Sequence, residues 1–192
     1  MKEGGLFFMK FTTKKLAAIG MLCAVAFVAT ACIHVKLVPG APFLTYDPKD
    51  IIIAIGGFIY GPLTAVIISA IVSFIEMITI SESGFIGLIM QMLATCAFTL
   101  PAAILYRDHR SKKMAAAGLA AGSVCMVIMM LLWNWLVTPF YLGCSRADVV
   151  PLLLPAILPF NAIKAVINTV LTLLVYKPVV NALRKTGLID QR

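Results

Sequence analysis

Charged residues are scarce in this sequence. Only 12% of its 192 residues are Asp, Glu, Lys or Arg, about half the share found in soluble domains. Hydrophobic residues make up 61% of the chain, and the mean hydropathy is +1.01. These values exclude an ordinary soluble domain and predict an integral membrane protein.

Motifs for catalysis or metal binding are also missing. The sequence has no GxxxxGK[ST] run, so we do not expect it to hydrolyse ATP by itself. It has no HExxH motif or Cys/His cluster, and its two histidines, His34 and His109, lie at the ends of apolar runs. Five cysteines occur without a CxxC pair and behave as small hydrophobes. We therefore predict no enzyme activity, no catalytic residue, no metal and no cofactor.

Six apolar runs dominate the chain. They cover roughly residues 15–35, 50–60, 62–80, 85–106, 113–140 and 155–182. A helix needs about 20 apolar residues to cross about 30 Å of hydrocarbon, and five of the runs are long enough. The sequence thus predicts an all-α membrane protein that forms one domain over residues 1–192.

The second and third runs could be read as a single helix from Ile51 to Ile78. Such a helix would be about 42 Å long, which is too long for about 30 Å of hydrocarbon without severe tilt. The segment GGFIYGP at residues 56–62 interrupts it. Pro62 suits the first turn of a new helix, and glycines suit a turn. We expect two helices, over residues 50–60 and 62–80, separated by a tight turn within the segment that begins at Gly56-Gly57.

The net charge of +8 indicates orientation in the bilayer rather than nucleic-acid binding, since most cations flank the apolar runs. Three basic groups lie at residues 2–15, 107–113 and 184–192. The positive-inside rule places all three in the cytoplasm. Only six crossings, four of them before residue 107, satisfy this arrangement. Both termini are then cytoplasmic.

The N-terminal region allows two interpretations. Lys14 and Lys15 precede an apolar run that ends at Cys32, as in a lipoprotein signal peptide. The run fills a whole span and more spans follow, so we favour a retained first helix. Met9-Lys10-Phe11 resembles a natural start, which leaves residues 1–9 open to interpretation as a leader or tag.

Two outer connections are expected. Residues 34–50 either form a lid or simply join two helices, and residues 141–155 join the fifth and sixth helices.

Polar residues at membrane depth are the candidate site. Asn161, Lys164 and Asn168 follow one another at i, i+3 and i+7, which places them on one helical face. Asn134 lies late in the fifth helix and Glu76 near the end of the third. Polar groups in a membrane are costly and usually mark a ligand or ion path.

Aromatic residues accompany this polar set. Trp133, Trp135, Phe140, Phe160 and Tyr46 offer flat apolar faces. Combined with amides and an ammonium, they suit a planar heteroaromatic ligand with a hydrogen-bonding edge and a polar tail.

Structural explanations stand beside this one. Lys164 could pair with Glu76 or snorkel to the outer surface. Asn134 and Asn168 could join helices, and the two tryptophans could anchor the protein at the membrane interface. In the first helix, the small-residue spacing Gly20–Ala24 suits either internal packing or docking to another membrane subunit.

Three segments carry a family resemblance. YDPKDIIIAIGGFIYGP (46–62), WNWLVTPFY (133–141) and LPFNAIKAVIN (158–168) resemble the riboflavin-binding S components, the RibU family, of energy-coupling factor (ECF) transporters. The resemblance spans about residues 10–185. It implies a six-helix bundle in the bacterial cell membrane that binds a vitamin near the outer face. It also implies two kinds of partner, a transmembrane coupling protein and two ABC-type ATPases.

Site roles follow from the resemblance. Asn134, Asn161 and Lys164 would bind the flavin ring or its ribityl chain, with Asn168 and Glu76 as weaker assignments. Tyr46 would belong to a lid over the ligand, assisted by Asp47. Trp133 and Phe160 complete the predicted ligand site. Gly20 and Ala24 would face the coupling protein.

We therefore predict a subunit that captures riboflavin at the outer face of the membrane. Its partner subunits would use ATP to drive the import. The alternatives are an S component for flavin mononucleotide or another planar vitamin, a proton-coupled secondary transporter using Glu76 with Lys164, and a purely structural membrane protein.

Overall fold

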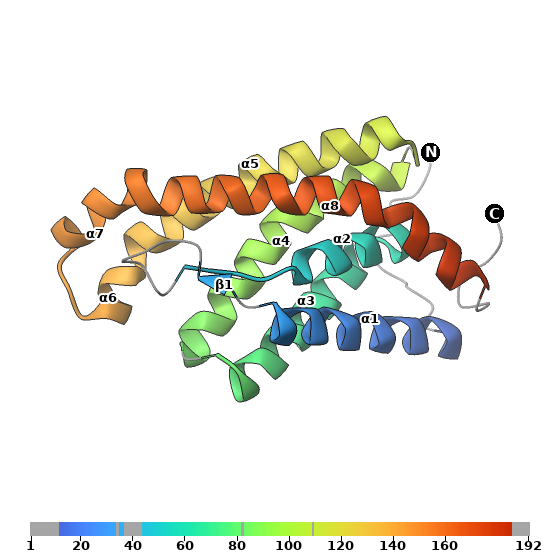
Figure 1. Cartoon of the computed structure of the whole chain (residues 1–192), viewed down its shortest axis with the longest axis horizontal. Coiled ribbons are helices and arrows are strands. Elements are labelled where there is room, and N and C mark those ends of the chain that lie inside the picture. Colours follow the sequence, from blue (N-terminus) through green and yellow to red (C-terminus); the bar gives the residue numbers. More distant parts are fainter. Residues whose placement is uncertain (1–11, 34, 37–43, 82, 109, 186–192) are drawn as a thin grey trace, which may run out of the picture.

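A computed structural model describes residues 12–33, 35–36, 44–81, 83–108 and 110–185 (Figure 1). The principal helices are α1 (Thr13–Cys32), α2 (Lys49–Tyr60), α3 (Pro62–Thr79), α4 (Gly84–Asp108), α5 (Lys112–Leu136) and α8 (Leu158–Lys185). Shorter helical elements are α6 (Thr138–Leu142), α7 (Arg146–Leu152) and the π-helix η1 (Leu153–Ile157). Between α1 and α2, the strands β1 (Val35–Lys36) and β2 (Thr45–Tyr46) pair antiparallel.

The predicted helical membrane architecture is confirmed. Within the described residues, five helical stretches are long and apolar enough to span a bilayer: 13–32, 62–79, 84–107, 112–136 and 146–183. Helix α2 has 12 residues, or about 18 Å, which is short of the ~30 Å hydrocarbon thickness. A sixth crossing and the cytoplasmic position of both ends stay predictions.

Helix α2 lies at the centre of the bundle, where it contacts α1, α3, α4 and α8. Figure 1 shows α5 and α8 along one edge, α1 along the other and α4 crossing between them. Nine of the residues of α2 are buried, including Lys49 and Asp50 in its first turn. The central position of α2 therefore brings charged groups into the protein interior.

The break between α2 and α3 lies at Gly61, as the predicted helix ranges 50–60 and 62–80 require, and not at Gly56-Gly57, where the interrupting segment begins. Gly61 has φ of 95°, a left-handed conformation that favours glycine, and Pro62 begins α3. Gly57 instead lies inside α2, where an added Cβ would be 3.1 Å from Ala103 and 3.2 Å from Ala65. The absence of a side chain at Gly57 lets three helices approach closely.

Two other boundaries differ from prediction. Helix α5 ends at Leu136 instead of residue 140, because Pro139 lies in the first turn of the separate helix α6, where a proline is tolerated. The expected loop over residues 141–155 is largely helical. Ser145 and Asp148 form a reciprocal capping box that starts α7, and η1 accommodates Pro155 before α8.

Helices α4 and α5 approach one another most closely at two glycines of α5. A Cβ on Gly122 would lie 2.0 Å from the carbonyl oxygen of Phe98, and one on Gly118 would lie 2.8 Å from Ala102 Cα. The backbones are therefore in direct contact, with no room for a methyl group.

Candidate ligand-binding site

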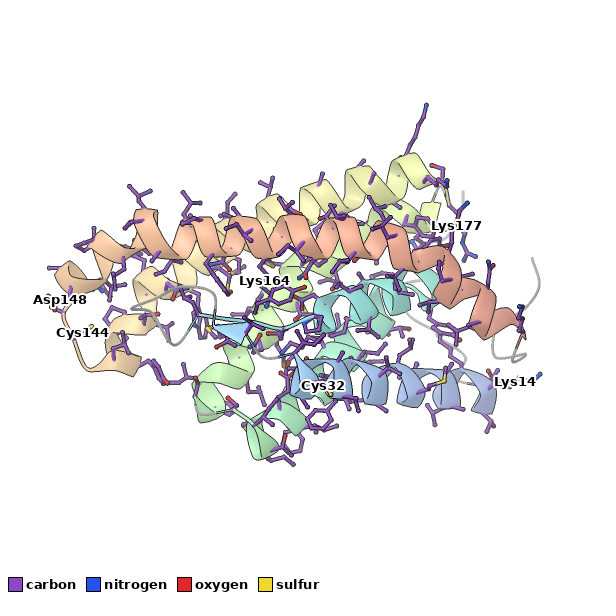
Figure 2. All side chains as sticks on the ribbon, in the orientation of Figure 1. Lys14, Cys32, Cys144, Asp148, Lys164 and Lys177 are labelled. Atoms are coloured by element: carbon purple, nitrogen blue, oxygen red, sulfur yellow. The ribbon has the colours of Figure 1, made fainter. Side chains whose placement is uncertain are left out.

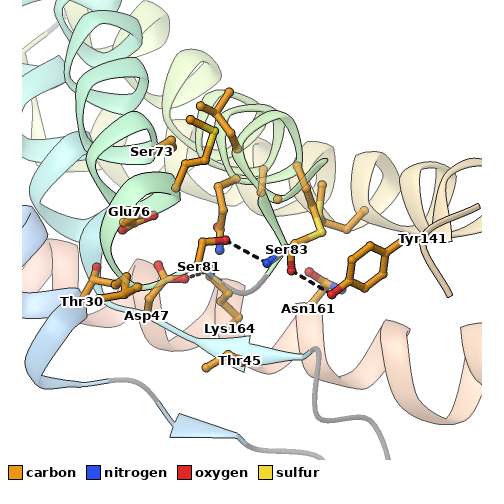
Figure 3. A pocket seen from close by; sticks show the side chains of 18 of the residues that line it. Thr30, Thr45, Asp47, Ser73, Glu76, Ser81, Ser83, Tyr141, Asn161 and Lys164 are labelled. Atoms are coloured by element: carbon orange, nitrogen blue, oxygen red, sulfur yellow. Dashed lines mark hydrogen bonds and ion pairs between the residues drawn. The ribbon is translucent and has the colours of Figure 1, made fainter. Parts of the chain in front are cut away.

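A cavity of about 480 Å³ lies between α1, β2, α3, α4, α5, α6 and α8 (Figure 3). This volume falls in the range of pockets that hold small organic ligands. Its apolar lining comes mainly from Met90, Ala94, Met126, Met130 and Phe160. Its polar lining includes Thr30, Asp47, Ser73, Glu76, Asn161 and Lys164. The cavity can therefore surround a ligand that has both a flat apolar body and polar groups.

The predicted ligand residues divide into two sets. The cavity is lined by Asp47, Glu76, Phe160, Asn161 and Lys164. Tyr46, Trp133, Asn134 and Asn168 lie outside its lining. All of the second set except Trp133 are buried.

Lys164 is buried, with 5% of its surface exposed, and Figure 2 shows it near the middle of the molecule. Its Nζ lies 3.3 Å from Asp47 Oδ2 and 3.5 Å from Asp50 Oδ2. Two of the structural explanations are wrong: Lys164 neither snorkels to the surface nor pairs with Glu76. The ammonium is compensated by carboxylates of the protein itself and does not depend on a ligand for its charge partner.

Asp50 is the centre of a buried hydrogen-bond network. Its Oδ1 accepts from Thr95 Oγ1 at 2.6 Å, and its Oδ2 accepts from Asn168 Nδ2 at 3.1 Å. Tyr46 then donates from its hydroxyl to Asn168 Oδ1 at 3.1 Å. Burial raises the pKa of the Tyr46 hydroxyl, so the group stays protonated and available as a donor. Asn168 thereby links α8 to α2 and β2, as expected for an amide that joins elements.

Lys49 forms an ion pair with Glu76 Oε2, and both residues are buried. Asp47 and Asp50 are buried in the same way as Lys49, although they lie at the end of an expected outer connection, and each of the three is at most 1% exposed. The shortness of α2 was the available signal, because a helix that cannot reach across the bilayer places its first turn inside the bundle.

The side chain of Asn134 hydrogen-bonds to residues close to it in the sequence. Its Nδ2 donates to Met130 O at 2.7 Å, and its Oδ1 accepts from Thr138 Oγ1 at 2.9 Å. It therefore links the end of α5 to the first residue of α6, and within the described residues it makes no hydrogen bond to α8 or any other distant helix. Asn161 donates to Ile157 O at 2.8 Å and lines the cavity.

The aromatic residues are less concentrated than predicted. Phe160 lines the cavity and packs with Leu44 and Tyr46 in a buried cluster. Trp133 packs against the main core. Trp135 and Phe140 are exposed, and the Arg146 guanidinium lies 5.5 Å from the Trp135 ring centroid. Trp135 thus fits the interface-anchor explanation, and four methionines contribute to the apolar cavity wall instead.

Gly20 and Ala24 are exposed on α1, and an added Cβ at Gly20 would meet nothing within 4 Å. The inward face of α1 is formed by other residues, including Ala18, Leu22 and Ala26. Internal packing therefore does not explain the Gly20–Ala24 spacing.

Residues 14–176 match the family described as "ECF transporter, substrate-specific component". The chain belongs to this family. The match confirms the sequence-based resemblance and the prediction of a transport component rather than an enzyme.

Named relatives of this substrate-specific component are riboflavin transporters. FmnP of Bacillus subtilis (strain 168) is 32% identical over 173 residues, which are 85% of this chain and 90% of the relative. RibU of Staphylococcus aureus (strain TCH60) is 28% identical over 179 residues, which are 90% and 93% of the two chains. RibU of Streptococcus thermophilus (strain ATCC BAA-250 / LMG 18311) is 25% identical, covering 93% and 88%.

A solved structure shows a similar fold. It is described as "Structure and mechanism of the S component of a bacterial ECF transporter" and shares 28% identity, with a TM-score of 0.74. The likeness covers 88% of this chain and 97% of that one.

Proposed function

We propose that this chain binds riboflavin from outside the cell and presents it for ATP-driven import. The amphipathic cavity carries this proposal: it combines a methionine-rich apolar wall with the amide of Asn161 and the ammonium of Lys164. A flavin has a matching flat ring with a hydrogen-bonding edge and a hydroxyl-bearing tail. The relatives named as riboflavin transporters support the choice of ligand.

We assign direct ligand contacts to the cavity-lining residues Asp47, Glu76, Phe160, Asn161 and Lys164. Lys164 can donate to a ring acceptor while Asp47 and Asp50 hold its position. Asn168 and Tyr46 would position this ammonium through Asp50 and β2. Asn134 and Trp133 would support the side of the cavity that α5 forms.

The proposed membrane topology has six crossings with both termini in the cytoplasm. Figure 2 shows Lys14 of α1 and Lys177 of α8 at one end of the bundle and Asp148 of α7 at the other. In Figure 1 the last turn of α4 and the first turn of α5, which carry Arg107, Lys112 and Lys113, lie at the same end of the bundle as the start of α1. This asymmetry agrees with a cytoplasmic basic end in a bacterial cell membrane.

The proposed partners are a transmembrane coupling protein and two ABC-type ATPases, as the family assignment implies. The exposed Gly20–Ala24 face of α1 would dock to the coupling protein, because small residues allow close helix contact in a membrane.

Titration of the purified protein with riboflavin, followed by quenching of flavin fluorescence, tests the ligand assignment. We expect saturable quenching with one ligand per chain, because a ring buried in the cavity is shielded from water. Absence of quenching at micromolar protein would overturn the proposal.

A further inference from the structure

Ser73 of α3 carries a hydroxyl that the protein itself does not use. The residue is 2% exposed, and its Oγ has no hydrogen-bond partner within the described part of the chain. It lines the cavity, as Figure 3 shows. A buried hydroxyl without a partner costs free energy, so its presence in the cavity wall requires an explanation.

Three buried hydroxyls, those of Ser69, Ser73 and Thr172, have no hydrogen-bond partner among the described residues, and of these only Ser73 lines the cavity. Several other helical hydroxyls are satisfied locally. Thr30, Thr99 and Ser123 each donate to the carbonyl oxygen four residues earlier, at 3.1, 2.7 and 2.8 Å. This bond is the usual way for a serine or threonine to remain in an apolar helix. Ser73 does not make it, so its donor and acceptor both stay available to a molecule in the cavity.

Glu76 adds a second available group beside Ser73. Its Oε2 is held by Lys49, whereas its Oε1 has no hydrogen-bond partner among the described residues. The spacing of i and i+3 places the two side chains on one face of α3. Both are buried and both line the cavity. Together they form an α3 wall with one hydroxyl and one free carboxylate oxygen.

The α4 and α5 parts of the lining differ in chemistry. Met90, Ala94, Met126 and Met130 provide apolar surface there, and Gln91 is the polar exception. Asn161 and Lys164 of α8 provide an amide and an ammonium. The apolar part suits ring faces, and the α8 groups suit ring acceptors. A chain of hydroxyls, which both donate and accept, fits the α3 wall best.

We infer that the α3 wall binds the hydroxyl-bearing tail of the ligand and that Ser73 is a specificity-determining residue for this tail. The inference rests on the proposed riboflavin-binding function and adds Ser73 to the residues that contact the ligand. Ser73 donates to or accepts from a tail hydroxyl, while Glu76 Oε1 accepts from a neighbouring one.

The test combines one side-chain deletion with one ligand deletion. Ser73→Ala is compared with Ser69→Ala, a matched control one turn away on α3. Ser69 is fully buried beside Cys96 and does not line the cavity. Each protein is titrated with riboflavin and with lumiflavin, which has the same ring with a methyl group in place of the polyol tail.

Ser73→Ala should weaken riboflavin binding about three- to tenfold, as expected for one neutral hydrogen bond. Its affinity for lumiflavin should stay within about twofold of the wild-type value, which also shows that the variant is folded. Ser69→Ala should leave both affinities unchanged.

Unchanged riboflavin affinity in Ser73→Ala would overturn the inference while leaving the proposed function intact. An equal loss for riboflavin and lumiflavin would also overturn it, because the tail would then not be the contact. An equal loss in Ser69→Ala would indicate a structural effect of α3 and have the same consequence. Wild-type protein that binds neither flavin would instead reject the proposed function, and this inference with it.

Discussion

Lys164 shows how a single residue combines stability and recognition. The Lys164 ammonium lies between Asp47 of the segment before α2 and Asp50 of α2, and all three residues are buried. Burial of each charge alone would be unfavourable, so the arrangement depends on all three remaining together.

Replacing Lys164 by Met should therefore destabilise the protein as well as weaken riboflavin binding. The variant removes the ammonium that lies within 3.5 Å of both Asp47 and Asp50, and loss of one partner of a buried pair typically costs about 3–5 kcal/mol. Thermal unfolding in detergent measures the effect. Lys177→Met, at an exposed lysine of the same helix, is the control and should keep its melting temperature. An unchanged melting temperature in Lys164→Met would show that the ion pairs make no net contribution to stability.

Flavin mononucleotide should bind at least about tenfold more weakly than riboflavin. Two carboxylates, Asp47 and Glu76, line the cavity, and Lys164 is already paired with Asp47 and Asp50. A phosphate would meet this negative charge without an uncompensated cation among the described cavity residues. Competition against bound riboflavin measures the ratio. Equal affinities would favour the alternative of a flavin mononucleotide carrier.

At the scale of helices, apolar run length determined most of what could be predicted. The runs at 62–80 and 85–106 agree with α3 and α4 within two residues at each end, because span length and flanking polar residues limit the choices. Helix α7 was missed although Ser145 and Asp148 carry a capping-box pattern. The pattern lies in a segment that was interpreted only as a connection.

The site was only partly predictable for a different reason. The one-face spacing of Asn161, Lys164 and Asn168 identified the correct side of α8. The partners of Lys164 were not identified, because Asp47 and Asp50 lie more than a hundred residues away and flank Pro48 at the end of an expected outer connection. Tertiary packing of a short helix, not local sequence, buries them.

The close contact between α4 and α5 predicts that Gly122→Ala lowers the stability of the protein. The added Cβ would lie 2.0 Å from Phe98 O, so the helices would have to separate. Overpacking of this kind costs about 1–3 kcal/mol, which exceeds the roughly 1 kcal/mol gain in helix propensity from Gly to Ala. Gly20→Ala is the matched control, since its Cβ would meet nothing within 4 Å. Melting temperatures should fall for Gly122→Ala only; equal behaviour of the two variants would contradict this.

At the scale of the whole molecule, binding and import should be separable. Gly20→Leu places a large side chain on the exposed face of α1, away from the cavity. We expect riboflavin binding to persist and ATP-dependent uptake in cells to be lost, because the partner helix can no longer approach closely. Val124→Leu, on the exposed surface of α5, is the control and should keep both activities. Normal uptake by Gly20→Leu would remove this face from the docking proposal.

The pairing of Lys164 with Asp47 has a consequence for how tightly any ligand can be held. An acceptor atom that approaches this ammonium shares it with a carboxylate already in place, 3.3 Å away. The ammonium has three donors and keeps Asp47 and Asp50 as partners, so a ligand acceptor takes only the donor that remains and the net gain from the contact is small. A ligand whose shape does not place an acceptor atom beside the Lys164 ammonium cannot make this contact. Lys164 therefore contributes more to selectivity among ligands than to affinity.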